Sequence, residues 1–417
     1  MQDDRTLTFR QIHGNREALL NAVKNIERIA LVESYGIGPL RLRFLEPYPQ
    51  GGSESDYILT PAREIRLADL NSYPYITVSY VWTHSQPIHG IKLPEYRVWD
   101  GADLQKPARL LRCPQIVFHR VVQYAKSEKL ERIWIDQECI DQDDSNDVEE
   151  NLQDMHRIYR FSRITVAVLS KVSDSWMYLP SRLSSLKDLS QTVAEVQTTK
   201  GMVRSMVDDP WFTRSWTFHE QHCAANIVYL LPTPVLHHFR LSSLEGFVED
   251  SVPTLEKDVV VYRFELSSHF YLCQQMSIDN SALKSYFLGH GHAGLVSANI
   301  PGAIETVQVK MESRENQVCS DRIQIIANVC GLGWKLKTTL LNNSTQSYST
   351  CLLVLTMANT WPDPAERAIR YERLGDAFMD GDIRIVLEGL NDAQWSDDWG
   401  LPPIGFHPDA IPSYEHS

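Results

Sequence analysis

The chain has 417 residues, with 40 Lys plus Arg against 53 Asp plus Glu, which gives a formal net charge of −13. This acidic balance argues against broad electrostatic binding to nucleic acid or to an anionic membrane surface. The length allows about two or three domains. A hydrophobic content of 43% with ten Trp excludes extensive disorder.

Signals for secretion or membrane insertion are lacking. The longest apolar runs, Ile164–Leu169 and Cys351–Leu355, are far shorter than the ~18 residues that a membrane-spanning helix needs. The first residues lack the basic and apolar regions of a signal peptide. The seven Cys are scattered and include no C-x-x-C pair. We therefore expect a cytoplasmic protein with reduced thiols and no membrane partner.

The chain is predicted to fold in three parts. Residues 1–71 form an N-terminal extension, with a helical pattern over Ala18–Ile29 and a strand-like alternation over Leu40–Leu45. Residues 72–234 form an α/β domain. Residues 235–417 have weaker and more helical patterning, which predicts a mainly helical region whose fold the sequence does not identify.

The α/β assignment rests on strands that alternate with helices. Four runs are almost continuously apolar and β-branched, and the segments between them have helical periodicity. Such strands are typical of a mainly parallel sheet with helices on both faces. The predicted strands are Ile76–Val81, Ile133–Asp136, Ile164–Leu169 and Ile227–Leu231, and the predicted helices include Ile116–Lys126 and Trp211–Ala225.

An acidic segment, Asp136–Asp144, follows the second predicted strand. It is not a calcium-binding EF-hand loop, because Asn146 replaces the turn glycine and Leu152 stands where the bidentate Glu belongs. Polar residues at the carboxyl end of a parallel strand are where open α/β sheets bind ligands. The alternative is a solvated loop that leads into the next helix, with Asp147 as its cap.

Two other motifs give weak signals. His219 and His222 are three residues apart, unlike the H-E-x-x-H zinc pattern, and no third ligand is identifiable, so we expect no metal. One buried and one exposed histidine is the simpler interpretation. Gly289–Gly294 matches G-x-G-x-x-G, but it follows at best a short strand and Pro301 cuts a following helix short. We interpret it as a flexible loop.

Several motifs, in this order, resemble the fungal heterokaryon incompatibility (HET) domain. They are Val78-Ser79-Tyr80-Val81-Trp82, then Trp134-Ile135-Asp136 with Cys139-Ile140 and Gln142-Asp143, then Met155-His156-Arg157-Ile158-Tyr159, and finally the Trp-x-x-Arg-x-Trp-x-x-x-Glu element over Trp211–Glu220. The resemblance spans residues 38–232, with a further Asp-Arg…Gly-Leu signature at Asp321-Arg322 and Gly331-Leu332. The chain departs from the family pattern at three positions. Thr83 replaces a Gly, and Glu138 and Asp141 replace a small residue and an Asn, which changes the charge of the predicted ligand loop.

The HET family is similar to Toll/interleukin-1 receptor (TIR) domains, so the resemblance implies a TIR-like, flavodoxin-like α/β fold. Ser215-Trp216…Glu220 resembles the TIR helix whose Glu serves NAD cleavage. The resemblance therefore makes Glu220 the candidate catalytic residue. NAD would be a substrate, and no cofactor is expected.

The candidate ligand-binding residues have chemistry that suits this reaction. A carboxylate can stabilise an oxocarbenium-like ribose, and a Trp can stack on a nicotinamide or adenine ring. Purely structural roles stay open: Glu220 can face solvent or pair with Arg214, the Trp side chains can pack in the core, and Asp136 can accept loop hydrogen bonds. The candidates are Ser79, Tyr80, Trp82, Asp136, Arg214 and Trp216.

Three functions are compatible with these residues, since a fold does not fix a function. The first is an incompatibility or innate-immunity type signalling protein that acts through NAD cleavage and leads to growth arrest or cell death. The second is a non-enzymatic module that self-associates or binds a protein partner. The third is an enzyme of specialised metabolism that reuses the domain pocket.

Overall fold

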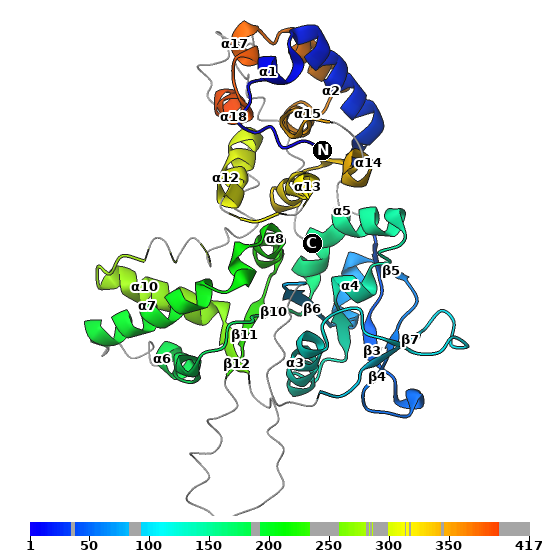
Figure 1. Cartoon of the computed structure of the whole chain (residues 1–417), viewed down its shortest axis with the longest axis vertical. Helices are drawn as coiled ribbons and strands as arrows, with labels where there is room; N and C mark the ends of the chain where they lie inside the picture. The colour runs from blue at the N-terminus through cyan, green and yellow to red at the C-terminus, as the bar shows by residue number, and fades with distance from the viewer. Residues whose placement is uncertain are drawn as a thin grey trace, which may run out of the picture. The chain divides into compact units, whose positions relative to one another are not determined.

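The computed structural model describes residues 1–34, 38–82, 93–184, 192–233, 258–280, 283, 286, 299–312, 314–316, 318–342 and 346–391 (Figure 1). The chain divides into two compact units. The sheet unit lies within Gly36–His292 and Ser313–Asn316, and the helical unit lies within Met1–Tyr35, Ala293–Glu312 and Gln317–Ser417. The predicted division into residues 1–71, 72–234 and 235–417 stays a prediction.

Four parallel strands form the middle of the sheet unit. Their order across the sheet is β11, β10, β6, β9, and each pairs in parallel with its neighbour. When these strands are numbered from one to four along the chain and the sheet is read from the β9 end, the order is 2-1-3-4. The prediction that these strands share one mainly parallel sheet is confirmed. Their bounds are β6 Tyr75–Tyr80, β9 Arg132–Trp134, β10 Ile164–Val168 and β11 Ile227–Leu231.

Five further strands extend this sheet on both sides and make it mixed. On one side β12 (Val259–Tyr262) runs antiparallel to β11. On the other side follow β3 (Leu45–Pro47), β4 (Asp56–Leu59), β7 (Arg97–Asp100) and β8 (Arg109–Leu110). The pairs β9–β3, β3–β4 and β7–β8 are antiparallel, whereas β4–β7 is parallel.

The single strand predicted over Leu40–Leu45 is wrong. The chain forms β2 (Leu40–Leu42) and β3, which belong to different sheets. β2 pairs with β5 (Arg63–Ile65) in a separate two-stranded sheet. Between them the backbone N–H of Phe44 donates to Thr60 Oγ1 at 2.9 Å instead of to a ladder partner, which separates the two strands.

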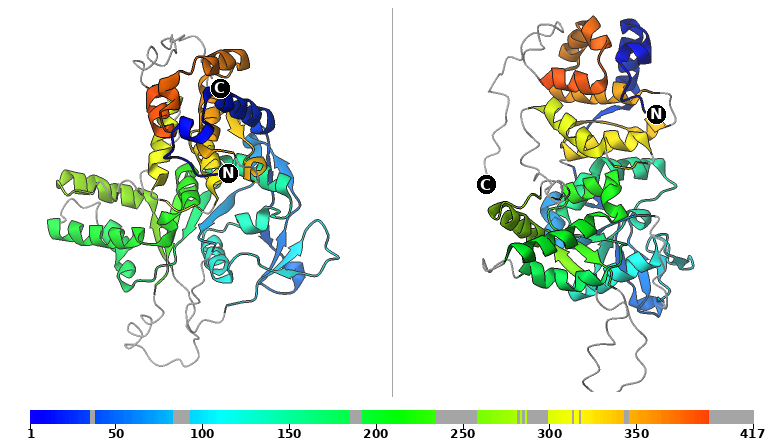
Figure 2. Two further views of the ribbon diagram at one scale, coloured as in Figure 1. Left: turned by 45° about the horizontal axis from the view of Figure 1, so that its top comes forward. Right: turned by 60° about the vertical axis from the view of Figure 1, so that its left-hand side comes forward.

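Helices cover both faces of the parallel strands, which explains why their sequences are apolar throughout (Figure 2). All six residues of β6 are buried. On one face, Val78 and Val166 belong to a core cluster with apolar side chains of α3 (Gln115–Ser127). On the other face, the hydroxyl of Tyr75 donates to the carbonyl of Ile158 in α5 at 2.7 Å.

α5 spans Ser145–Phe161, and its cap differs from the prediction. The N-cap is Asp144, whose side chain accepts from the N–H of Asn146 at 2.9 Å. Asp147 instead lies within the first turn of the helix, where it is buried and accepts from Arg41, Arg43 and the N–H of Asp141. The expectation that Asp147 caps the helix is therefore wrong.

The helix predicted over Trp211–Ala225 is interrupted. A 3-10 turn spans Pro210–Thr213, and α8 begins only at Ser215 and ends at Cys223. Arg214 between them is extended, with φ −90° and ψ 143°. The backbone N–H of Ser215 donates to the carbonyl of Glu315 at 3.1 Å, and the N–H of Glu315 donates to Thr213 at 2.7 Å. These two bonds replace helical bonds and hold the break open.

The remaining helices of the sheet unit lie around these elements. They are α4 Asp136–Cys139, the 3-10 helices Pro49–Gly51, Leu67–Ser72 and Asp174–Tyr178, and the α-helices α6 Leu179–Ser184, α7 Val193–Val207 and α10 Arg263–Gln275.

The helical unit brings together the N-terminal helices and those of the C-terminal half. Its short strands β1 (Leu31–Glu33) and β13 (Trp334–Leu336) pair antiparallel. Its central helix, α15 (Tyr348–Thr360), has buried residues from Tyr348 to Asn359 and so forms the middle of the core. The other helices are α1 Phe9–His13, α2 Arg16–Ala30, α12 Ile300–Glu312, α13 Cys319–Val329, α14 Thr338–Asn342, α16 Pro364–Glu372, α17 Asp376–Met379 and α18 Ile383–Asn391.

The mainly helical character expected for the C-terminal region agrees with this structure. In the part of the chain that is described, none of the helices combines the length and the apolar character needed to cross a membrane.

Candidate active site at the ends of the parallel strands

Glu220 and Ser79 meet at the carboxyl end of β6. Glu220 lies on α8 and is 7% exposed, and Ser79 is buried. The Ser79 hydroxyl donates a hydrogen bond to Glu220 Oε2. Open α/β sheets bind ligands at this edge, where the order of the strands reverses. The interpretation of Glu220 as a solvent-facing residue is therefore wrong.

Two aromatic side chains fix this pair. The indole Nε1 of Trp211, which is fully buried, donates to Ser79 Oγ at 2.8 Å. Tyr159 of α5 forms a side-chain hydrogen bond with Glu220, and its hydroxyl lies 3.1 Å from the carbonyl of Val78. Trp211 therefore packs in the core, as one interpretation held, and also orients the Ser79 hydroxyl.

Asp136 organises the neighbouring strand end. It is the first residue of α4, separated from β9 by Ile135, rather than the last residue of a strand. Its Oδ2 accepts from Trp82 Nε1 at 2.8 Å, and its Oδ1 lies 3.3 Å from the hydroxyl of Tyr80. The Tyr80 hydroxyl also lies 2.5 Å from Gln137 Oε1. Trp82 is 46% exposed, so its ring presents an accessible aromatic surface beside this carboxylate.

The pKa values of both carboxyl groups are shifted from their ordinary values. Burial raises the pKa of Glu220 well above its ordinary value, and the charge of Asp136 raises it further. Hydrogen bonds from Ser79 and Tyr159, together with the charge of Arg214, oppose this rise in pKa. Burial raises the pKa of Asp136 to about 6. Hydrogen bonds from Trp82, Tyr80 and the N–H of Gln137 oppose this rise in pKa, as does the charge of Arg214. A pair with shifted pKa values at a strand end is a candidate site for acid–base chemistry.

Arg214 and Trp216 lie at either side of the start of α8. Arg214 acts on both carboxylates through its charge. Its extended backbone places it before the helix instead of within it. Trp216 is half-buried, and its ring meets that of His219 edge-on with centroids 5.4 Å apart. The role of Trp216 in ligand binding stays a prediction.

Residues 75–220 match the family model described as Heterokaryon incompatibility protein (HET). This segment is a HET domain. The match runs from the first residue of β6 to Glu220, so it contains all seven candidate residues but is shorter than the expected 38–232. No curated protein and no solved structure gives a significant match to the chain.

The histidines of the HET domain differ from the expectation that one of the pair is exposed. His219 and His222 are both buried, because α8 is enclosed over its whole length. Among the described residues, no group of three His, Cys, Asp or Glu side chains could hold a metal ion. The expectation of no metal stays a prediction. Gly289–Gly294 and Thr83 lie outside the described residues.

Tyr159 was missed as a site residue, although its position in the sequence carried a signal. It ends the Met155–Tyr159 motif, in which the apolar residues Met155 and Ile158 indicate a helix face that packs in the core. In the structure this Tyr belongs to the face of α5 that meets the sheet, and its pKa is raised well above the ordinary value by burial and by the charge of Glu220. The motif thus combines packing residues with one polar group directed at the carboxylate.

Proposed function

We propose that this protein acts in heterokaryon incompatibility or a related immune-type response, and that its HET domain cleaves the nicotinamide–ribose bond of NAD. The HET match supports the biological role. The observation that carries the chemistry is the buried Glu220 carboxyl, hydrogen-bonded to Ser79 and electrostatically coupled to Asp136.

The reaction balances as a hydrolysis. The bond between ribose C1′ and the nicotinamide nitrogen breaks, and its electron pair neutralises the pyridinium. C1′ passes through an oxocarbenium-like state, which a nearby carboxylate stabilises. Water then adds at C1′ and gives its proton to a carboxylate, leaving ADP-ribose, nicotinamide and H⁺. We assign Glu220 to the ribose, and Asp136 to holding the Trp82 ring in place for stacking.

The strand order supports a flavodoxin-like, TIR-like core for this domain. Parallel strands in the order 2-1-3-4 begin the arrangement found in flavodoxin-like sheets, whose ligand binds where the order reverses. In this sheet the reversal lies between β6 and β10, and Ser79 stands at the end of β6, opposite Ala167.

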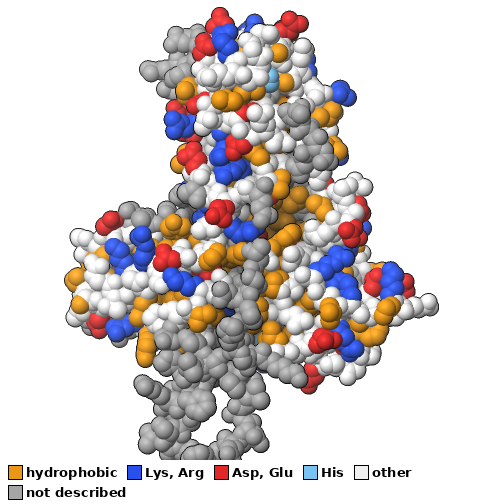
Figure 3. Space-filling model, viewed as in Figure 1, with side chains coloured by type: hydrophobic (Ala, Val, Ile, Leu, Met, Phe, Trp, Pro, Cys, Tyr) orange, Lys and Arg blue, Asp and Glu red, His pale blue; other side chains and the backbone are white. Residues whose placement is uncertain are grey.

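The deciding experiment is incubation of the purified full-length chain with NAD, with nicotinamide release followed by chromatography. We expect nicotinamide and ADP-ribose in equal amounts. A chain that is folded and shows no release at any concentration would leave the self-association or partner-binding module as the better account. On the face drawn in Figure 3, acidic and basic side chains are interspersed over the described residues, which favours a protein or nucleotide partner over nucleic acid.

Turnover is expected to fall on acidification at a pH well above 4, where an exposed carboxyl would titrate. The reason is that the carboxylate pair must be ionised, and burial shifts its protonation to higher pH. The fall in turnover on the acid side of the pH profile, here called the acid limb, reports an apparent pKa of the pair as a whole, because the two groups are coupled. Initial rates between pH 4.5 and 8 measure it.

Two variants should move this acid limb in opposite directions. Asp136→Asn removes a like charge, so the pKa of Glu220 falls and the limb moves to lower pH. Arg214→Gln removes an opposite charge, so the limb moves to higher pH. Equal limbs in wild type and both variants would contradict the assignment of Glu220.

Turnover per chain is also expected to rise with protein concentration. This proposal rests on the resemblance to TIR domains, whose pockets are often completed by a neighbouring subunit. Specific activity across a wide dilution series, combined with sedimentation, measures it. A flat specific activity in a protein that sediments as a monomer would exclude the dependence on self-association.

A further inference from the structure

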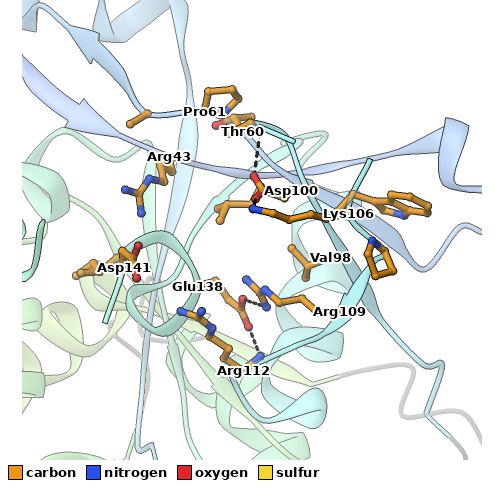
Figure 4. A pocket seen from close by; sticks show the side chains of 16 residues that line it. Arg43, Thr60, Pro61, Val98, Asp100, Lys106, Arg109, Arg112, Glu138 and Asp141 are labelled. Carbon is orange, nitrogen blue, oxygen red and sulfur yellow. Dashed lines mark hydrogen bonds and ion pairs between the residues drawn. The ribbon is translucent and has the colours of Figure 1, made fainter. Parts of the chain in front are cut away.

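The sheet unit has a cavity that is lined by none of the seven candidate residues at the Glu220 site (Figure 4). Its volume is about 690 Å³, within the range of small-molecule sites. β7, β8 and the segment that follows Asp136 contribute to its walls. Four cationic side chains line it, although the chain as a whole has a net charge of −13: Arg43, Lys106, Arg109 and Arg112.

Two of the carboxylates in the cavity already have cationic partners. Glu138 is 1% exposed, its Oε1 accepts from the backbone N–H groups of Arg112 and Cys113, and its Oε2 lies 2.8 Å from Arg109 Nη1. Asp100 pairs with Lys106 at 3.3 Å. The third lining carboxylate, Asp141, accepts from the backbone N–H of Asp143 at 3.2 Å.

The guanidinium of Arg112 makes no hydrogen bond or ion pair with any part of the chain that the structure describes. In Figure 4, Arg109 and Arg112 lie on either side of Glu138, and Arg43 lies above them. Arg43 shares one carboxylate oxygen of Asp147 with Arg41, each at 3.2 Å. Since a guanidinium has five N–H donors, several donors of these arginines have no acceptor within the described ranges of the chain.

We propose that this cavity binds the diphosphate group of a small phosphorylated molecule, with Arg112 as the main anchor and Arg43 and Arg109 as secondary contacts. The planar guanidinium matches two phosphate oxygens at once, and such charge-assisted bonds are strong. A diphosphate, with more than one charge, suits a cavity lined by three guanidiniums better than a ligand with a single carboxylate does. The indole of Trp99 also lines the cavity and offers a wall for a base.

The test is titration calorimetry on the full chain with sodium pyrophosphate and with ADP at constant ionic strength. Binding involves no bond cleavage, so the result is independent of the proposed NAD reaction. Tighter binding of ADP than of pyrophosphate would identify a nucleotide site, and equal binding would identify a site for the diphosphate alone.

Arg112→Gln should weaken binding by about ten- to a hundredfold, the range for a lost charge-assisted contact. The matched control is Arg66→Gln, the same charge change at an exposed position of the sheet unit that does not line the cavity, and it should change affinity less than about twofold. Because the Arg112 side chain has no partner among the residues that the structure describes, the variant should keep the wild-type melting temperature. Absence of binding by both ligands, or equal weakening by the two variants, would overturn the proposal.

Discussion

Glu220→Gln is expected to reduce NAD cleavage by about a thousandfold while leaving the protein folded. The amide has almost the same shape as the carboxyl group and can still accept from the Ser79 hydroxyl. It cannot carry the negative charge that stabilises the ribose cation. Burial of the charge is unfavourable at this position, as the raised pKa of Glu220 shows, so the neutral amide should not lower the melting temperature.

One further variant tests whether the position of the Glu220 carboxylate matters as well as its charge, and a second serves as a control. Glu220→Asp keeps the charge but shortens the side chain, and it should recover only a small part of the lost turnover because the carboxylate no longer reaches Ser79 Oγ. The matched control is Glu128→Gln, the same substitution at an exposed position of the same domain, which should retain wild-type turnover. Wild-type turnover in Glu220→Gln would refute the catalytic assignment.

The parallel sheet could be predicted from the sequence because its strands are buried on both faces. Runs such as Ile164–Leu169 leave no polar face, and the helices between them supply the covering layers. The meeting of Ser79, Asp136 and Glu220 could also be predicted, since parallel strands bring their carboxyl ends to one edge. The HET motifs marked the same residues independently.

Other features could not be predicted because they depend on partners far away in the sequence. The break at Arg214 is held by Glu315, about one hundred residues later, and helical periodicity does not register such a bond. The role of Trp211 as a donor to Ser79 depends on the packing of its ring. The cationic cavity joins Arg43 with Arg109 and Arg112, which share no motif or spacing.

Asp209 accepts hydrogen bonds that stabilise the HET domain and that also position Trp211 at the candidate site. It is completely buried and lies just before Trp211. Its Oδ2 accepts from the backbone N–H groups of Ser170 and Lys171, at 2.7 and 2.6 Å, and its Oδ1 accepts from the N–H of Trp211 at 2.8 Å. One carboxylate thus ties the end of β10 to the turn that positions Trp211 against Ser79.

Asp209→Ala is therefore expected to lower the free energy of unfolding by about 3 kcal/mol, because one buried and two part-buried N–H groups lose their acceptor. Urea unfolding followed by Trp fluorescence measures the change. The neighbouring Asp208→Ala is the matched control: this side chain is 57% exposed, and its ion pair with Lys171 at 3.2 Å contributes less than about 1 kcal/mol. If both variants lost the same stability, Asp209 would not be the tie between β10 and Trp211. If only Asp209→Ala lost stability, residual NAD cleavage by its folded fraction should also fall, since the Ser79 hydroxyl loses the indole that orients it.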